Sequence, residues 1–382
     1  MVAYKNPGRT GKNFRPNPAR TIEVNGLLKR DLAQKILAQT KALGKKSSQP
    51  IILHLSSGGG AVKAFYDLEP IFDNEHRGKT HCSIITIARE ARSAAAYLLV
   101  AGDVACAIKG AQLVFHGVRI HPGRKTRSLW RENTFALALR LDRENRKIAK
   151  RLARKTVWRI AELHSRVKIL SQNRGASAQT PEQFMEGLVA GMGAQLSNDK
   201  AKGVLYESHE RVKLILALAK YFPTHDPPRN RRGLAAYEAD VFAATIAYEI
   251  GTHPAPEWTI DPVVAVEIMM DYLLARDFIR GRHRALVREL ALAYGRNFLS
   301  AKSLAEYGKI RRTHPRRAEA YLLKLAGPCA ASLWYFALTL CHRLLSGETH
   351  LSAIEAYWLG LIDQVLERSV VGLQPGQATN SR

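Results

Sequence analysis

The sequence predicts an α/β protein whose core is interrupted by a long, mostly helical insertion. Residues 20–120 alternate short apolar runs of strand length with stretches whose apolar residues recur at helical spacing. From residue 121 to 345 the pattern changes to long helical stretches. A short helical pattern followed by a strand-like run then closes the core within residues 346–371. This order favours one α/β domain with parallel strands.

The elements of residues 20–120 follow one another in strict alternation. Strands are expected at 20–26, 50–55, 82–88 and 112–116, and helices at 29–43, at 61–72 and directly after Ser93. In a parallel sheet the functional loops lie at the carboxyl ends of the strands. Ser57–Gly60 and His116 both fall at such ends.

The remaining chain divides into the insertion and two terminal segments. Helices are expected within it at 130–170, 204–221, 234–250, 262–292, 315–325 and 330–345. Residues 1–19 form a basic N-terminal segment, and the polar residues 372–382 are expected to be a disordered tail.

The composition favours a soluble, reduced, cytoplasmic protein. The chain has 382 residues, 46% hydrophobic and 24% charged. Its four cysteines stand alone, without metal spacing, and are expected to be buried thiols. The basic N-terminus has no apolar core and is not expected to be a secretory signal. The apolar run Leu325–Cys341 is shorter than the ~20 residues of a membrane span, so a buried helix and no membrane partner are predicted.

Three features near Ser93 and His116 suggest acyl-transfer chemistry. A strand runs into the glycine turn Ser56–Gly60, Ser93 opens an apolar helix, and His116 ends a later strand. A serine hydroxyl needs an imidazole to accept its proton, and backbone N–H groups stabilise the oxyanion that forms. Taken singly, Ser93 could instead be a helix N-cap and His116 a core histidine.

These residues resemble the proteolytic subunit of the ATP-dependent Clp protease, which has a crotonase-like fold. The similar segments are the glycine turn Ser56–Gly60, the serine frame Arg89–Gly102 and the run Leu113–His116. The resemblance also covers the end of the chain, where Leu351-Ser-Ala opens the last helix and Leu359-Gly-Leu-Ile-Asp ends it.

The resemblance implies a Clp-protease/crotonase-like β-α superhelical core and a serine endopeptidase. Ser93 would be the nucleophile, His116 the base and Glu348 the orienting acid, with the N–H groups of Gly60 and Ala94 as the oxyanion hole. A second Leu-Ser-Ala at Leu299 has Arg296 in the place of the acid, which could not orient an imidazole. The resemblance further implies a ring-shaped homo-oligomer that receives unfolded polypeptide from a separate AAA+ ATPase, with no cofactor.

The chain departs from the family immediately before the serine. Arg89, Glu90 and Arg92 stand where the family has small residues, so Arg92 could crowd the nucleophile and Glu90 could divert His116. A catalytically degenerate protein whose basic insertion binds nucleic acid or a protein is therefore the alternative. A crotonase-like acyl-CoA enzyme is a third hypothesis, which the pair of Ser93 and His116 disfavours.

A stripe of cations within residues 143–155 could contact an anionic partner such as nucleic acid. Its members recur on one helix face: Arg143, Arg146, Lys147, Lys150, Arg151, Arg154 and Lys155. The formal net charge of +25 supports such a partner, although a solvated helix face is the simpler interpretation. No spacing of His, Cys, Asp or Glu indicates a metal site.

Overall fold

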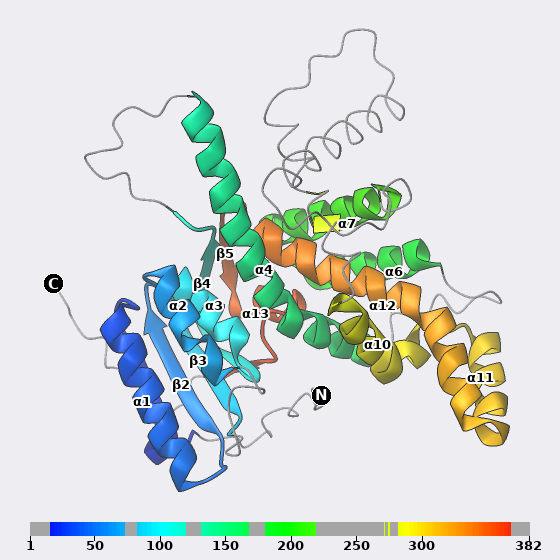
Figure 1. Ribbon diagram of the computed structural model, residues 1–382, viewed down its shortest axis with the longest axis horizontal. Coiled ribbons are helices and arrows are strands. Elements are labelled where there is room, and N and C mark those ends of the chain that lie inside the picture. Colours follow the sequence, from blue (N-terminus) through cyan, green and yellow to red (C-terminus); the bar gives the residue numbers. More distant parts are fainter. Residues whose placement is uncertain are drawn as a thin grey trace, which may run out of the picture. The chain divides into compact units, whose positions relative to one another are not determined.

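The computed structural model describes residues 16–72, 82–119, 131–167, 180–218, 271, 274–275 and 282–367 (Figure 1). The chain divides into two compact units. The first comprises Met1–Val167, Ala190–Leu205 and Leu340–Arg382, and the second comprises Lys168–Val189 and Tyr206–Thr339.

One sheet forms the centre of the first unit. Its strands are β1 (Thr21–Asn25), β2 (Ile51–Ser57), β3 (Ile84–Arg92), β4 (Val104–His116), β5 (Glu348–Ser352) and β6 (Gln364–Leu366). β1 to β4 pair in sequence order and in parallel, β5 pairs antiparallel with β4, and β6 pairs parallel with β4. The predicted α/β class with parallel strands is confirmed, and β4 begins earlier than predicted.

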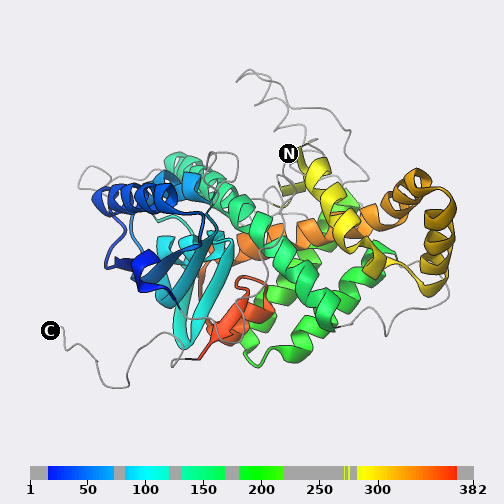
Figure 2. The same ribbon diagram turned by 90° about the horizontal axis from the view of Figure 1, so that it is seen from below.

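Three helices cover one face of this sheet. They are α1 (Arg30–Lys46), α2 (Val62–Leu68) and α3 (Ala94–Ala101), as Figures 1 and 2 show. Leu53 and Leu55 of β2 are fully buried, and their register partners Ile22 and Val24 of β1 are buried with them. Side chains alternate between the faces of a strand, so these four residues share one face.

The opposite face of the sheet is apolar as well. Ile52, Ile85, Ile87, Val104, Cys106, Ile108 and Leu366 form one buried cluster there. Side chains on both faces of β2 are therefore buried. This explains why its sequence is a nearly continuous apolar run, as is usual in parallel sheets.

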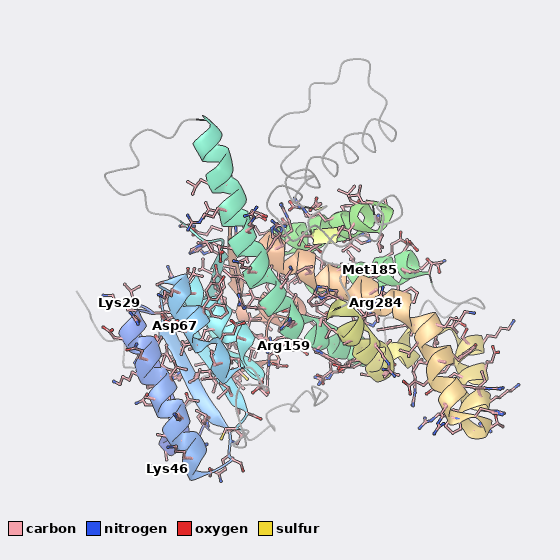
Figure 3. All side chains as sticks on the ribbon, viewed as in Figure 1. Lys29, Lys46, Asp67, Arg159, Met185 and Arg284 are labelled. Atoms are coloured by element: carbon pink, nitrogen blue, oxygen red, sulfur yellow. The ribbon has the colours of Figure 1, made fainter. Side chains whose placement is uncertain are left out.

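The long helix α4 (Arg131–Val167) also belongs to the first unit. Arg159 of α4, labelled in Figure 3, is 5% exposed and donates hydrogen bonds to the carbonyls of Val100, Gly102 and Leu361. Its Nε lies 2.8 Å from Asp363 Oδ2. The first unit therefore extends beyond the predicted core of 20–120 and 346–371, because α4 is tied to it by a buried charge.

The described part of the second unit is helical. Its residues lie in α6 (Pro181–Gln195), α7 (Asp199–Leu218), α10 (Arg282–Tyr294), α11 (Ala301–Thr313) and α12 (Pro315–Leu345). The sequence does not predict α6 or α11. The expected helix at 234–250, most of the one at 262–292 and the polar tail from 372 lie outside the described residues.

The helix α12 corrects the prediction of two helices at 315–325 and 330–345. It continues through Pro328, which costs a main-chain hydrogen bond. Buried residues before and after the proline, such as Leu322 and Leu333, hold the two halves in one helix.

By length and composition α12 could also cross a membrane. However, 67% of its apolar window is buried inside the protein, as in a core helix, and this agrees with the predicted buried helix. The four cysteines are free and buried, which confirms the sequence-based expectation.

Candidate active site

Ser93 lies at the carboxyl end of β3 in a backbone conformation that side chains rarely adopt. Its φ is 54° and its ψ is −125°, and it is the one non-glycine residue with positive φ in the described part of the chain. Such a conformation costs about 1–3 kcal/mol and is concentrated at functional sites. Ser93 occupies the N-cap position of α3, but its hydroxyl makes no capping hydrogen bond there.

The glycine turn after β2 lies directly against Ser93. A Cβ placed on Gly59 would meet Ser93 Cβ at 2.6 Å and the Arg92 carbonyl oxygen at 2.5 Å. Gly59 also has a φ of 97°, which favours glycine. The turn and the serine are thus neighbours, as the sequence predicts.

Main-chain hydrogen bonds fix the glycine turn from the side of β1. Leu28 N–H donates to the Gly59 carbonyl at 2.7 Å, and Ala61 N–H donates to the Leu28 carbonyl at 3.0 Å. Gly60 has no room for a side chain against Leu28. Within the described residues, the N–H groups of Gly60 and Ala94 close no turn, loop or cap, so both remain available as oxyanion-hole donors.

His116 ends β4 and is half-buried, so it is not a core histidine. Its Nδ1 lies 2.7 Å from the carbonyl oxygen of Gly117. The buried hydroxyl of Tyr97, on α3, donates a hydrogen bond to the His116 carbonyl. Burial raises the pKa of Tyr97, so this hydroxyl keeps its proton. Ser93 and His116 are further joined through β4, because Ser93 N–H donates to the Val114 carbonyl at 2.8 Å.

Glu348 starts β5 and is the register partner of His116. Directly opposed residues of an antiparallel pair share one face, with Cβ atoms about 4.5–5.5 Å apart. The carboxylate nevertheless binds elsewhere, to the guanidinium of Arg119 and, at 2.9 Å, to Nε2 of His350. These two hydrogen bonds, that from Arg119 first, lower the pKa of Glu348. No hydrogen bond between the side chains of Ser93, His116 and Glu348 is formed in the described structure.

The charged residues before Ser93 bind one another. Arg92 Nε lies 2.7 Å from Glu90 Oε1, and Arg92 also donates to the side-chain oxygen of Gln112 at 3.1 Å. Arg89 is exposed. Glu90 is thus engaged by Arg92, and no contact between Glu90 and His116 occurs among the described residues.

Four of the seven cations in the basic stripe of α4 form ion pairs within the first unit. Arg146 pairs with Asp142, Lys147 with Glu144, Arg151 with Glu69, and Lys155 with Asp103. Arg151 also lies over the ring of Tyr66. Arg146 and Lys147 pair within α4 itself, whereas Arg151 and Lys155 join α4 to Glu69 and Asp103. Contact of the stripe with a nucleic acid stays a prediction.

One comparison with known proteins finds a match. Residues 15–178 match the sequence model of Clp protease. This segment is Clp protease-like. It contains Ser93, His116, Gly60 and Ala94 and ends before Glu348, so the Clp protease match does not extend to the third residue of the predicted triad. No curated protein matches the chain. The Clp protease match supports a peptidase.

Sequence reasoning missed two residues beside the site, Tyr97 and Arg119. Tyr97 stands in an otherwise aliphatic helix one turn after Ser93, and this isolated hydroxyl was the available signal. Arg119 carries no such signal, because its contact with Glu348 joins residues far apart in the sequence. No cluster of three metal-binding side chains occurs among the residues that the structure describes.

Proposed function

We propose that the protein is a Clp-type serine endopeptidase subunit. The observation that carries this proposal is the strained backbone of Ser93, which lies against a glycine turn. The N–H groups of Gly60 and Ala94 there make no hydrogen bond among the described residues. Strained backbone is concentrated at functional sites, and a hydroxyl that makes no capping hydrogen bond is available as a nucleophile. The match of residues 15–178 to Clp protease supports the same reaction class.

The reaction would proceed through an acyl-enzyme. Ser93 Oγ attacks the peptide carbonyl carbon while His116 accepts the hydroxyl proton, and the N–H groups of Gly60 and Ala94 stabilise the oxyanion. His116 then donates that proton to the leaving amine as the C–N bond breaks. Water, deprotonated by His116, hydrolyses the ester and restores Ser93.

Glu348 would orient His116 after its carboxylate leaves Arg119. The two residues are opposite each other in the ladder, so side-chain rotations that also release His350 and the Gly117 carbonyl would bring them together without moving β5. Catalytic hydrogen bonds are often absent from unliganded sites and form only with substrate.

The family resemblance extends this proposal to the setting of the enzyme. We expect a crotonase-like superhelical core and a cytoplasmic, ring-shaped homo-oligomer without a cofactor. Unfolded polypeptide would reach it through a separate AAA+ ATPase.

A catalytically degenerate protein is the second candidate. It is favoured by the engagement of Glu348 with Arg119 and His350 and of His116 Nδ1 with Gly117. In that protein Ser93 would keep its conformation without being activated.

Covalent labelling distinguishes the two candidates. We expect a fluorophosphonate probe to label the full-length protein and the control variant Ser48→Ala, whose serine is exposed and distant in sequence from the site. Ser93→Ala should abolish both labelling and peptide hydrolysis while the circular dichroism spectrum stays unchanged. Labelling that persists in Ser93→Ala, or an unlabelled wild-type protein, would refute the endopeptidase.

A further inference from the structure

The corner between α11 and α12 carries a dense group of cations. The nine residues from Lys309 to Arg317 include five cations and no acidic residue. These cations are Lys309, Arg311, Arg312, Arg316 and Arg317, and each of them is exposed. Figure 3 shows nitrogen-tipped side chains projecting outward from α11 and the start of α12.

The carboxylates nearest in sequence do not neutralise this corner. Glu319 pairs with Arg288 of α10 at 2.6 Å, and Glu306 accepts a hydrogen bond from the Tyr321 hydroxyl at 2.8 Å. Among the described residues, none of the five corner cations has an ion-pair partner. The corner differs in this respect from the α4 stripe, most of which is internally paired.

The N-terminus of α12 adds positive potential at the corner, whereas the C-terminus of α11 carries a partial negative charge beside Arg311 and Arg312. Arg316 and Arg317 lie in the first turn of α12, which contains no acidic residue. The N-terminus of a helix carries a partial positive charge and normally favours acidic side chains there. Two arginines at this end raise the electrostatic energy of the free protein, and a bound anion would lower it.

The residue types at the corner favour one class of anionic partner over others. Four of the five cations are arginines, whose planar guanidinium groups match phosphate oxygens in bidentate geometry. Insertion into a membrane needs exposed apolar side chains, but the large exposed ones in the described chain are Leu27, Tyr206, Leu292 and Ile354, outside this corner. Stacking on single-stranded bases needs free aromatic rings, whereas Tyr307 is buried and Tyr321 is partly buried with its hydroxyl bonded to Glu306.

We propose that the α11–α12 corner binds the phosphate backbone of a double-stranded nucleic acid. A duplex carries about one negative charge per 1.7 Å of its axis, which gives a compact group of cations several phosphates to contact. Contacts to phosphate position a protein on a duplex but carry no sequence information, so binding through these contacts should be independent of sequence. This activity is independent of peptide hydrolysis and uses no residue of the Ser93 site.

The test compares two variants of the full-length protein that lose the same charge. In the first, Arg311, Arg312, Arg316 and Arg317 are changed to alanine. In the control, four exposed lysines of α1 are changed to alanine: Lys35, Lys41, Lys45 and Lys46. Lys46 at the end of α1 is labelled in Figure 3.

Binding of a short labelled DNA duplex is measured by fluorescence anisotropy from about 50 to about 200 mM salt. Each phosphate contact contributes about 0.9 to the log–log salt slope, so the corner variant should lose about 3.6 from the wild-type slope. We expect at least a tenfold weaker affinity at the lowest salt for this variant. The control should bind the duplex like the wild type.

A charge-retaining variant and other anionic partners provide further tests. A variant with lysine at the same four positions should keep the salt slope, because the charge is retained. Equal weakening in the α1 control, no wild-type binding at low salt, or tighter binding to polyglutamate or to anionic vesicles than to the duplex would each overturn the proposal. Unchanged thermal unfolding of the corner variant verifies that it is folded.

Discussion

The hydroxyl of Tyr97 donates a hydrogen bond to the main-chain carbonyl of His116. Tyr97 lies on α3, one turn after Ser93, and is completely buried. The bond therefore couples the helix that follows the proposed nucleophile to the strand end that carries the proposed base. Tyr97 acts as a positioning residue, since it touches the main chain of His116 rather than the reacting groups.

Removing this hydroxyl should impair catalysis more than folding. Loss of one hydrogen bond of about 1 kcal/mol predicts that Tyr97→Phe lowers kcat about fivefold with KM unchanged. Tyr66→Phe is the control, because the Tyr66 hydroxyl bonds Glu144 of α4 at 3.1 Å. Steady-state kinetics with a fluorogenic peptide give kcat and KM for each variant. An equal loss of kcat in Tyr97→Phe and Tyr66→Phe would contradict the positioning role.

Two adjacent glycines should respond differently to alanine. Gly59→Ala would place a Cβ 2.6 Å from Ser93 Cβ, so we expect fluorophosphonate labelling to fall by at least tenfold and stability by about 1–3 kcal/mol. Gly58→Ala meets no atom within 4 Å and should be nearly neutral. Labelling rate and chemical denaturation report both effects. Normal labelling of Gly59→Ala would show that the turn does not constrain Ser93.

The contact between Arg119 and Glu348 should compete with the triad. Arg119→Ala removes the hydrogen bond that contributes most to lowering the pKa of Glu348, so that pKa should rise toward its usual value. The carboxylate would then keep only its hydrogen bond to His350 and would reach His116 more readily, so kcat/KM near neutral pH should increase about two- to fivefold. Lys109→Ala, which breaks a similar exposed pair with Glu367, is the control. A decrease in kcat/KM for Arg119→Ala would mean that Arg119 assists the reaction.

The buried pair of Arg159 and Asp363 should contribute more to the free energy of unfolding than the exposed cations of α4 do. Arg159→Met leaves Asp363 without its cation, and breaking a buried pair in this way costs about 3–5 kcal/mol. The free energy of unfolding from urea titration measures the loss. Arg154→Met on the same helix removes an exposed cation and should cost less than about 0.5 kcal/mol. Similar losses in the two variants would refute the anchoring role.

Burial of His164 should make the protein sensitive to acid. Desolvation lowers the pKa of this histidine to about 4 from 6.5, so between these values the unfolded chain binds a proton that the folded chain does not. Stability should thus be complete above pH 6.5 and fall by about 3 kcal/mol as the pH decreases to about 4. His164→Phe should flatten this part of the stability profile, whereas replacement of the exposed His314 should leave it unchanged. A profile unaffected by His164→Phe would contradict the assignment.

The order of strands and helices over residues 20–120 followed from local patterns alone. Apolar alternation located β1, β2 and β3, and the parallel arrangement of these strands places the glycine turn and Ser93 at one edge of the sheet. The helix break expected at Pro328 is absent. Burial of the apolar residues on both sides outweighs the tendency of proline to end a helix.

The sequence by itself located Ser93, His116 and the glycine turn at the ends of strands, since each lies in a short segment whose apolar pattern predicts the strand before it. Only the tertiary structure decided which partners the charged side chains take. Glu348 contacts Arg119, Arg151 and Lys155 of α4 pair with carboxylates far along the chain, and the cations of the α11–α12 corner remain unpaired in the described chain. Ion pairs depend on distances between residues remote in sequence, and neither composition nor periodicity encodes those distances.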